Sequence, residues 1–325
     1  MIAPDLPAEL RGALEAKLEG LPRGDVAARA ATISKTYREG GGSGTIRTAT
    51  DALAYALARM PATYAAVAAC LNALSEARPG FTPKSLLDVG AGPGTASWAA
   101  AEAFASLSSF ALLDANGALR TIALDLLGGS PRFRGLSYEA GEARGALAKS
   151  DGADLVVASY LIGELGEAER IALADAMWAR TREALLVVEP GTPAGYARIL
   201  ALRDHLIAAG AHVAAPCPHA QKCPLTPPDW CHFSQRLARS RAHKQMKGAD
   251  VPFEDERFSY VVLTRAPVAK SLSRVLAQPV LGKAEITAKL CTTDGVAIAS
   301  VPRRDRSAYA AARHWRWGDA VKEKS

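Results

Sequence analysis

Long hydrophobic runs are absent from this sequence of 325 residues. Charged residues or prolines interrupt its apolar stretches well before the roughly 20 residues that a membrane-spanning helix requires, so no membrane association is expected. The N-terminus has no basic segment followed by an apolar one, and acidic residues occur early in it, which argues against a secretory signal and an organelle transit peptide. The sequence therefore predicts a cytoplasmic protein.

Cysteine is also scarce, with five in the whole chain. Cys70 stands in an alanine-rich helical stretch and is expected to be a small buried apolar residue. The other four, Cys217, Cys223, Cys231 and Cys291, all lie in the last part of the chain. In a reducing cytoplasm such a group indicates a metal site rather than disulfides.

Positive charge is unevenly distributed along the chain. Residues 1–200 hold 19 Lys and Arg against 22 Asp and Glu, whereas residues 201–325 hold 20 against 11. A strongly basic C-terminal part favours a polyanionic partner, most simply a nucleic acid. The plainer interpretation is a solvated basic surface.

The composition is that of a globular protein, because 49% of the residues are hydrophobic and 22% are charged. From about residue 84, short apolar segments alternate with helix-length ones, which predicts a parallel, doubly wound α/β sheet. Strands are expected at 84–90, 109–114, 131–137, 154–160, 184–189, 211–215 and 258–264, with helices at 166–182 and 194–209 between them.

Three regions are expected along the chain. Residues 1–80 are predicted to form a helical N-terminal part, in which the Gly-rich run 39–45 is expected to be a flexible connection. Residues 81–265 are predicted to form the α/β core, with a Cys-rich metal-binding insertion at about 216–256. Residues 266–325 are predicted to form a small basic β extension that carries the fourth cysteine.

A Gly-rich motif follows the first strand of the core and opens a helix. It contains Asp88, Gly90, Gly92 and Gly94, and Asp114 ends the next strand. Glycines at this place allow a tight turn and the close approach of a ligand to backbone amides. The motif reads G-x-G-x-G after an acid, and not the dinucleotide form G-x-G-x-x-G.

This motif resembles motif I of class I S-adenosylmethionine-dependent methyltransferases, which have a Rossmann-like sheet. The resemblance implies that Gly90, Gly92 and Gly94 pack under the amino-acid end of S-adenosyl-L-methionine. It further implies that Asp88 belongs to this cofactor-binding motif and that Asp114 accepts hydrogen bonds from the ribose hydroxyls.

Catalytic residues are not evident from the sequence. Amino-methyltransferases of this fold carry an Asn/Asp-Pro-Pro-aromatic run after the fourth strand, where this chain has residues 158–165 without that motif. Glu164 could act as a base and Tyr160 could stack on a ligand. A helix start with a buried tyrosine explains both residues equally well.

The spacing of the four late cysteines differs from that of paired zinc knuckles. Five residues separate Cys217 from Cys223, seven separate Cys223 from Cys231, and 59 precede Cys291. Four thiolates without a knuckle fit an iron–sulfur cluster, whereas zinc held by three cysteines and His219 or His232 is the alternative.

Cationic and aromatic residues surround the third of these cysteines. A metal-organised loop that displays them would form an RNA-binding surface, although each arginine alone could simply be solvated. The residues are Trp230, Phe233, Arg236, Arg239, Arg241, Lys244 and Lys247.

The cysteine string 217–236, together with the methyltransferase core and a terminal Trp317-Gly318-Asp319, resembles one family. It comprises the methyltransferase-like proteins of the mitochondrial small ribosomal subunit and their bacterial relatives. The resemblance implies a [4Fe-4S] cluster held by the four late cysteines. It also implies binding to small-subunit rRNA, rather than DNA, in ribosome assembly or translation. An active rRNA methyltransferase, with the metal site as structural support, is the alternative function.

Overall fold

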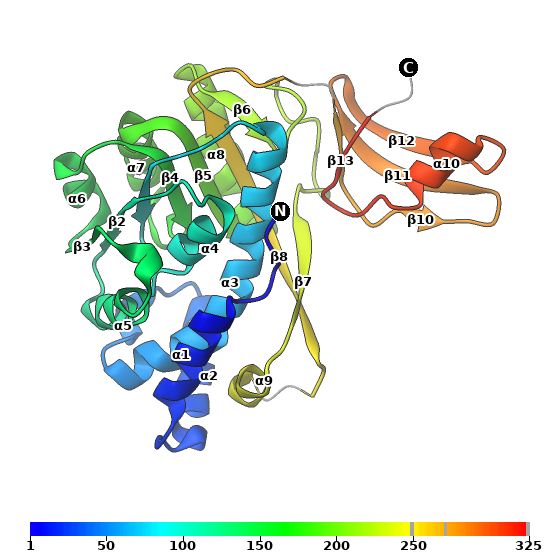
Figure 1. Cartoon of the computed structure of the whole chain (residues 1–325). Helices are drawn as coiled ribbons and strands as arrows, with labels where there is room; N and C mark the ends of the chain where they lie inside the picture. Colours follow the sequence, from blue (N-terminus) through cyan, green and yellow to red (C-terminus); the bar gives the residue numbers. More distant parts are fainter. Residues whose placement is uncertain (248–249, 270–271, 323–325) are drawn as a thin grey trace.

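The computed structural model describes residues 1–247, 250–269 and 272–322 of the chain. Figure 1 shows N-terminal helices packed against a central sheet, and a smaller sheet that carries the C-terminal part of the chain. Within the described residues, no helix is long and apolar enough to cross a membrane.

Three helices form the N-terminal part: α1 (Ala8–Leu18), α2 (Arg23–Arg38) and α3 (Ala49–Ala77). The last of these is the main packing element, since 18 of its 29 residues are buried. It begins at a capping box, in which the Thr48 side chain accepts a hydrogen bond from the Asp51 amide and the Asp51 side chain accepts one from the Thr48 amide. The helix continues through Pro61, and Cys70 lies fully buried on it, as predicted.

The central sheet has the strand order β3-β2-β1-β4-β5-β8-β6. Strands β1 to β5 run parallel, and β8 is antiparallel to both of its neighbours in this order. This is the order of a class I methyltransferase, so the predicted fold is confirmed. The strands are β1 (Ser85–Val89), β2 (Ser109–Asp114), β3 (Leu136–Ala140), β4 (Ala153–Ser159), β5 (Thr181–Pro190), β6 (His212–Ala215) and β8 (Phe253–Thr264).

Helices cover both faces of this sheet, and successive strand residues alternate between two cores. Leu86 packs into the core on the side of α3, α4 and α5, whereas Leu87 packs into the core on the side of α6, α7 and α8. Burial on both faces explains why the strands are near-continuous apolar runs in the sequence. The helices are α4 (Thr95–Ala103), α5 (Gly117–Gly128), α6 (Ala143–Lys149), α7 (Glu167–Arg180) and α8 (Pro193–Ala208).

Two predicted elements lie elsewhere than expected. The third strand begins at Leu136, because Pro131 opens a short 3-10 helix, η2 (Pro131–Phe133). The last strand of the core begins at Phe253 and pairs with β7 (Phe233–Ala238), and both run to α9 (Arg241–Lys247). This hairpin, which we call the arm, projects beyond the sheet toward α1 and α2 (Figure 1).

The second sheet is antiparallel and belongs to the C-terminal part of the chain. One of its faces is covered by a short helix through Ile286, Val301 and Ala312. The described elements are β9 (Ser273–Val275), β10 (Val280–Leu281), β11 (Glu285–Thr292), β12 (Gly295–Pro302), α10 (Arg306–Ala312) and β13 (Ala320–Val321).

Candidate functional site

A cavity of about 250 Å³ opens at the carboxyl ends of β1, β2 and β4. This edge of a doubly wound sheet is where such folds bind ligands. Of the predicted cofactor residues, Gly90, Gly92 and Asp114 line it. The remaining lining residues come from the N-terminal helices and from the segments that follow β2, β3 and β4: Tyr37, Ser43, Tyr55, Ala115, Leu119, Glu142, Ala143, Arg144, Ser159, Tyr160, Leu161, Glu164, Leu165, Glu169 and Leu173.

The Gly-rich turn requires glycine for two separate reasons. Gly90 has a φ of 68°, and a Cβ at this position would lie 2.8 Å from Leu161 Cδ1. Gly94 has a φ of 80° at the N-cap of α4, and its Cβ would lie 2.7 Å from Leu127 Cδ1. The turn therefore brings backbone, without side chains, to the floor of the cavity. Gly94 itself lies behind the lining.

Asp114 holds this turn in place from the end of β2. Its Oδ2 accepts a hydrogen bond from the Gly92 amide at 2.8 Å, and its Oδ1 accepts one from the Asn116 amide at 2.7 Å. Burial raises the pKa of this carboxyl. Both oxygens are thus fixed by backbone amides while the residue faces the cavity.

Asp88 lies behind the turn and does not line the cavity. Its Oδ2 accepts hydrogen bonds from the Ser97 amide at 3.0 Å and the Ser97 hydroxyl at 2.7 Å. Its fully buried Oδ1 has no partner among the described residues. Burial raises the pKa of Asp88 to about 7. The residue therefore anchors the first turn of α4 from behind the cavity.

The Gly-rich run 39–45 is not the flexible connection that the sequence suggested. It contains the short helix η1 (Ser43–Thr45), and Ser43 lies at one rim of the cavity. The Asn116 side chain donates to the carbonyls of Ser43 at 2.9 Å and Ile46 at 3.0 Å, and Glu164 accepts a hydrogen bond from the Ser43 amide at 3.3 Å. Only this tertiary pairing reveals the rim, because no ligand-binding motif marks it in the sequence.

Tyr160 is the only non-glycine residue with a positive φ, 57°, within the described parts of the chain. It directly follows β4, lines the cavity, and donates a hydrogen bond from its hydroxyl to Glu256 at 2.8 Å. Arg59 of α3 pairs with the same carboxylate at 3.3 Å and lies 5.8 Å from the centre of the tyrosine ring. Such a backbone conformation persists only where surrounding contacts impose it. Tyr160 is therefore held at the cavity by the arm.

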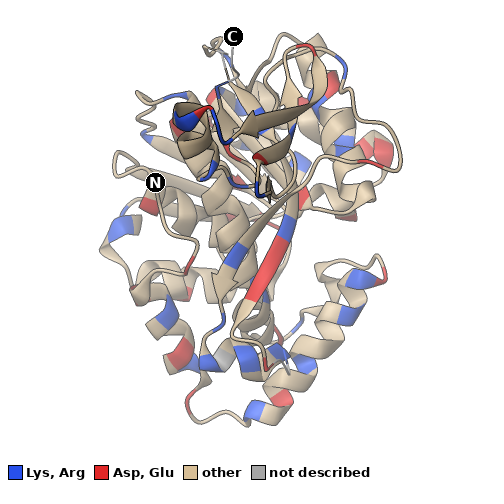
Figure 2. Cartoon of the chain, turned by 90° about the vertical axis from the view of Figure 1, so that its right-hand side faces the viewer, with Lys and Arg blue, Asp and Glu red and all other residues tan. Residues whose placement is uncertain are grey.

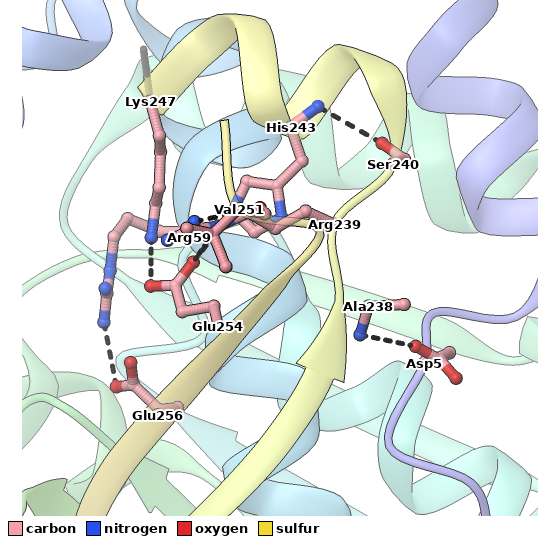
Figure 3. A network of polar contacts seen from close by, with 10 residues as sticks. All are labelled: Asp5, Arg59, Ala238, Arg239, Ser240, His243, Lys247, Val251, Glu254 and Glu256. Carbon is pink, nitrogen blue, oxygen red and sulfur yellow. Dashed lines mark hydrogen bonds and ion pairs between the residues drawn. The ribbon is translucent and has the colours of Figure 1, made fainter. Parts of the chain in front are cut away.

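Figure 3 shows that this contact continues along β8 into a larger polar network. Glu254, two residues before Glu256 on the strand, pairs with Lys247 of α9 and with Arg239 at 3.4 Å. His243 lies 3.3 Å from the same carboxylate. One acidic side chain thus compensates the cations that meet where the arm folds back.

Replacing Glu254 with alanine should destabilise the protein more than replacing its neighbour Asp255. Glu254 is 15% exposed and faces the cations of the network, so its loss leaves them uncompensated and should cost about 2 to 3 kcal/mol. Asp255 is 39% exposed and pairs with the exposed Arg236, so its loss should cost less than about 1 kcal/mol. Urea unfolding followed by circular dichroism measures both. Equal losses would show that the network does not stabilise the arm.

Acidic partners that were not anticipated from the sequence pair with most cations of the basic segment of the arm. Arg236 forms a bidentate pair with Asp255 at 2.8 Å, and Arg239 and Lys247 pair with Glu254. Figure 2 shows the acidic stretch of β8 as a red band beside β7. In the part of the chain that the structure describes, only Arg241 and Lys244 of this segment have no acidic partner.

The two aromatic residues of that predicted surface are engaged as well. Phe233 is 3% exposed and packs against Phe258 and Tyr260. The Trp230 indole stacks on His232 and donates a hydrogen bond to the Gly191 carbonyl at 3.0 Å. Phe233 is thus part of the core, whereas Trp230 is half-buried, so stacking of Trp230 on an RNA base stays a prediction.

All four late cysteines line one cavity between α8, the 216–231 segment and the C-terminal sheet. Cys217, Cys223 and Cys231 come from the segment that links β6 to β7, and Cys291 comes from β11. The structure therefore brings together residues that are separated by up to 74 positions in the sequence.

Burial and two neighbouring arginines act on the thiols in opposite directions, since burial disfavours the thiolate form and the arginines favour it. Burial raises the pKa of the Cys231 thiol, and it raises that of Cys291 to about 12. Arg203 and Arg274, which are 2% and 7% exposed, line the same cavity. Two buried cations beside four thiols offset the negative charge that thiolates would carry.

The buried arginines also hold the loop that carries the cysteines. Arg203 donates to the carbonyls of His219 at 3.0 Å and Gln221 at 2.8 Å, and Arg274 donates to the Pro216 carbonyl at 3.0 Å. The Tyr196 hydroxyl donates to Cys223 Sγ at 3.2 Å. Cys291 Sγ lies 3.7 Å from His219 Nε2.

The donor set fits both predicted metal groups. Four cysteines are the ligands of an iron–sulfur cluster and also of structural zinc, and the buried arginines beside them would offset thiolate charge in either case. Among the residues that the structure describes, no three His, Cys, Asp or Glu side chains are placed to hold a metal ion.

The chain is similar to two curated proteins in sequence and to one solved structure in fold. The chain is 30% identical over 299 residues to the human "Ribosome assembly protein METTL17, mitochondrial", covering 83% of this chain and 62% of that protein. It is 26% identical to "Rsm22-cox11 tandem protein 2, mitochondrial" of Schizosaccharomyces pombe, covering 84% of this chain and 43% of that protein. The chain thus spans less than two thirds of either relative. The magnesium protoporphyrin IX methyltransferase of Synechocystis, solved with bound SAH, aligns with a TM-score of 0.42 and 11% identity over 72% of this chain and 94% of that one.

A family model covers most of the chain and places it among these proteins. Its match begins at the start of α3, passes through the Gly-rich turn and the cysteine cavity, and ends after the second sheet. Since residues 49–322 match the family described as "Mitochondrial small ribosomal subunit Rsm22", the chain belongs to that family.

Proposed function

We propose that this protein binds S-adenosyl-L-methionine and a [4Fe-4S] cluster, binds small-subunit rRNA, and acts in assembly of the small ribosomal subunit or in translation. The observation that carries the proposal is the family match over residues 49–322. It is supported by the human relative, whose name describes a ribosome assembly protein.

S-adenosyl-L-methionine is proposed for the cavity at the carboxyl ends of the parallel strands. Gly90 and Gly92 would approach the ligand through their backbone, and Asp114 would accept hydrogen bonds from the ribose. When bound, the ligand supplies an activated methyl group. Glu164 accepts a hydrogen bond from Ser43 at the rim, and Tyr160 donates one to Glu256 of the arm. These contacts favour a role in shaping the ligand site over acid–base catalysis.

The iron–sulfur cluster is proposed for the cavity that Cys217, Cys223, Cys231 and Cys291 line. It would supply a rigid link, because its ligands come from the β6–β7 segment and from the second sheet. The link would fix the basic C-terminal sheet against the methyltransferase core.

Anaerobic purification with metal analysis tests the cluster. A brown protein with absorption near ~400 nm and about four irons and four sulfides per chain would support it. A colourless protein with one zinc per chain would replace the cluster with the zinc site. A protein without either metal would remove this part of the proposal.

Sedimentation tests the ribosomal role. The tagged protein should migrate with small ribosomal subunits or their precursors in a sucrose gradient, and its deletion should reduce mature small subunits relative to large ones. Migration with free protein and unchanged subunit ratios would contradict the assembly role. Incubation of precursor subunits with radiolabelled S-adenosyl-L-methionine separates the alternative function, since transfer of label to rRNA would indicate an active methyltransferase.

A further inference from the structure

Exposed arginines without ion pairs gather on the C-terminal sheet. Residues 272–322 hold nine Lys and Arg against four Asp and Glu. Five arginines lie in the turn before α10, at its first residue and in the segment after it, and all five are exposed. Within the described ranges, none forms an ion pair. We call them the arginine face: Arg303, Arg304, Arg306, Arg313 and Arg316.

The acidic residues beside these arginines are engaged with backbone amides. Asp305 caps α10 by accepting a hydrogen bond from the Ala308 amide at 3.1 Å. Asp319 accepts one from the Arg316 amide at 2.8 Å. These contacts order the turns that carry the arginines, as capping does generally. The positive side chains are therefore presented on ordered backbone.

The helix and strands that carry the arginine face pack against one another through a small hydrophobic cluster. Ala312 of α10 is fully buried against Ile286 and Val301, with Trp315 at the edge of the same cluster. Strand β12, which ends just before Arg303, pairs with β11 along its whole length. Figure 2 shows α10 and its flanking turns on the side of the C-terminal sheet that faces the viewer, with blue segments along them.

The arm provides an internal contrast. Its cations Arg236, Arg239 and Lys247 are compensated by two acidic residues of β8, which offsets their attraction for a polyanion. Among the described residues, no ion pair compensates the arginine face, where Asp319 alone lies close enough to Arg316 to interact with its charge. Arginine also forms paired hydrogen bonds with phosphate oxygens, and lysine acts there only as a point charge.

We infer that the arginine face, and not the arm, is the main surface that binds the phosphate backbone of small-subunit rRNA. The inference rests on the proposed function, because it takes RNA as the partner. It also assigns a role to Cys291, which lies on β11 beside β12 and ties this sheet to the thiol cavity. The orientation of the arginine face then depends on that cavity.

A pair of matched double variants tests the inference. Arg303→Gln with Arg304→Gln removes two charges from the arginine face, and Arg241→Gln with Lys244→Gln removes two from the uncompensated part of the arm. Filter binding to transcribed small-subunit rRNA across a salt series measures both. We expect the first variant to bind roughly tenfold more weakly, and its salt slope to fall by about 1 for each phosphate that it no longer binds. The second should stay within about twofold of the parent protein.

Four outcomes are informative. The expected difference between the two variants, with unchanged circular dichroism and metal content, supports the inference. If the parent protein binds rRNA and the arginine-face variant binds equally well, the inference fails and the proposed function stands. If the parent protein does not bind rRNA above a poly(U) control, the proposed rRNA binding fails too. If only migration with small subunits is lost, the partner of this face is a protein, which overturns the assignment to RNA.

Discussion

If the proposed cluster is bound, replacing Cys291 with serine is expected to remove it and loosen the C-terminal sheet from the core. Cys291 is the only one of the four late cysteines that comes from the second sheet. A group bound to all four thiols therefore joins two parts of the fold, and losing one ligand breaks that link. We expect iron per chain to fall severalfold, and the unfolding midpoint to fall by about 4 to 7 °C, as a loss of about 3 to 5 kcal/mol implies for a chain of this size.

Limited proteolysis locates the effect of this change. New cleavage should occur between residues 216 and 232, where the loop would lose its metal, while the methyltransferase core stays intact. The C-terminal sheet should remain partly attached, because Lys289 pairs with Asp229 and the Trp317 indole donates to the His232 carbonyl at 2.9 Å. The matched control is Cys70→Ala, since Cys70 is buried in α3 outside this cavity. Parental iron content and cleavage in the Cys291 variant would contradict the prediction.

The central sheet was predictable because its sequence pattern has one physical cause. Strands buried on both faces must be apolar at consecutive positions, as Leu86 and Leu87 show by packing into different cores. The Gly-rich turn was predictable for a related reason, since the positive φ of Gly90 excludes most other residues. Local constraints of this kind leave a mark in the sequence.

The arm was not predictable because its stability depends on distant partners. The stretch Glu254-Asp255-Glu256 reads as a polar loop, yet it is a strand whose acids face alternately inward and outward. Its inward acids are compensated by Arg59, far away in the N-terminal helix, and by Lys247. The ion pairs of the basic segment of the arm could not be predicted from the sequence either, because the acidic partners lie on another strand, β8.

The cysteine cavity falls between these two cases. The types and number of the residues indicated a metal site, but the distance of 59 residues left the position of Cys291 open. Tertiary structure closes that gap, since β11 lies beside the segment that carries the other three cysteines. The buried Arg203 and Arg274 that face the thiols had no signal in the sequence, because their roles depend only on burial.

Two isosteric replacements should separate the roles of the acidic residues at the cofactor cavity. Asp114 uses both oxygens as acceptors, for the amides of Gly92 and Asn116, and an asparagine offers only one. Asp114→Asn should therefore disturb the turn and remove the charge proposed to bind the ribose. Loss of one charged hydrogen bond, about 1.5 to 3 kcal/mol, should weaken binding of S-adenosyl-L-methionine about 10- to 100-fold in calorimetry.

Asp88→Asn is the matched control, because only Oδ2 of Asp88 accepts hydrogen bonds and an amide oxygen can replace it. Binding of the ligand should change much less than in the Asp114 variant. The pKa of Asp88 is raised from 3.8 to about 7, so its contribution to stability is lost as the pH rises through about 7. The parent protein should thus lose unfolding free energy between about pH 4 and 7, and Asp88→Asn should lose less. Equal loss of ligand affinity in both variants would instead place the buried Oδ1 of Asp88 in the cofactor site.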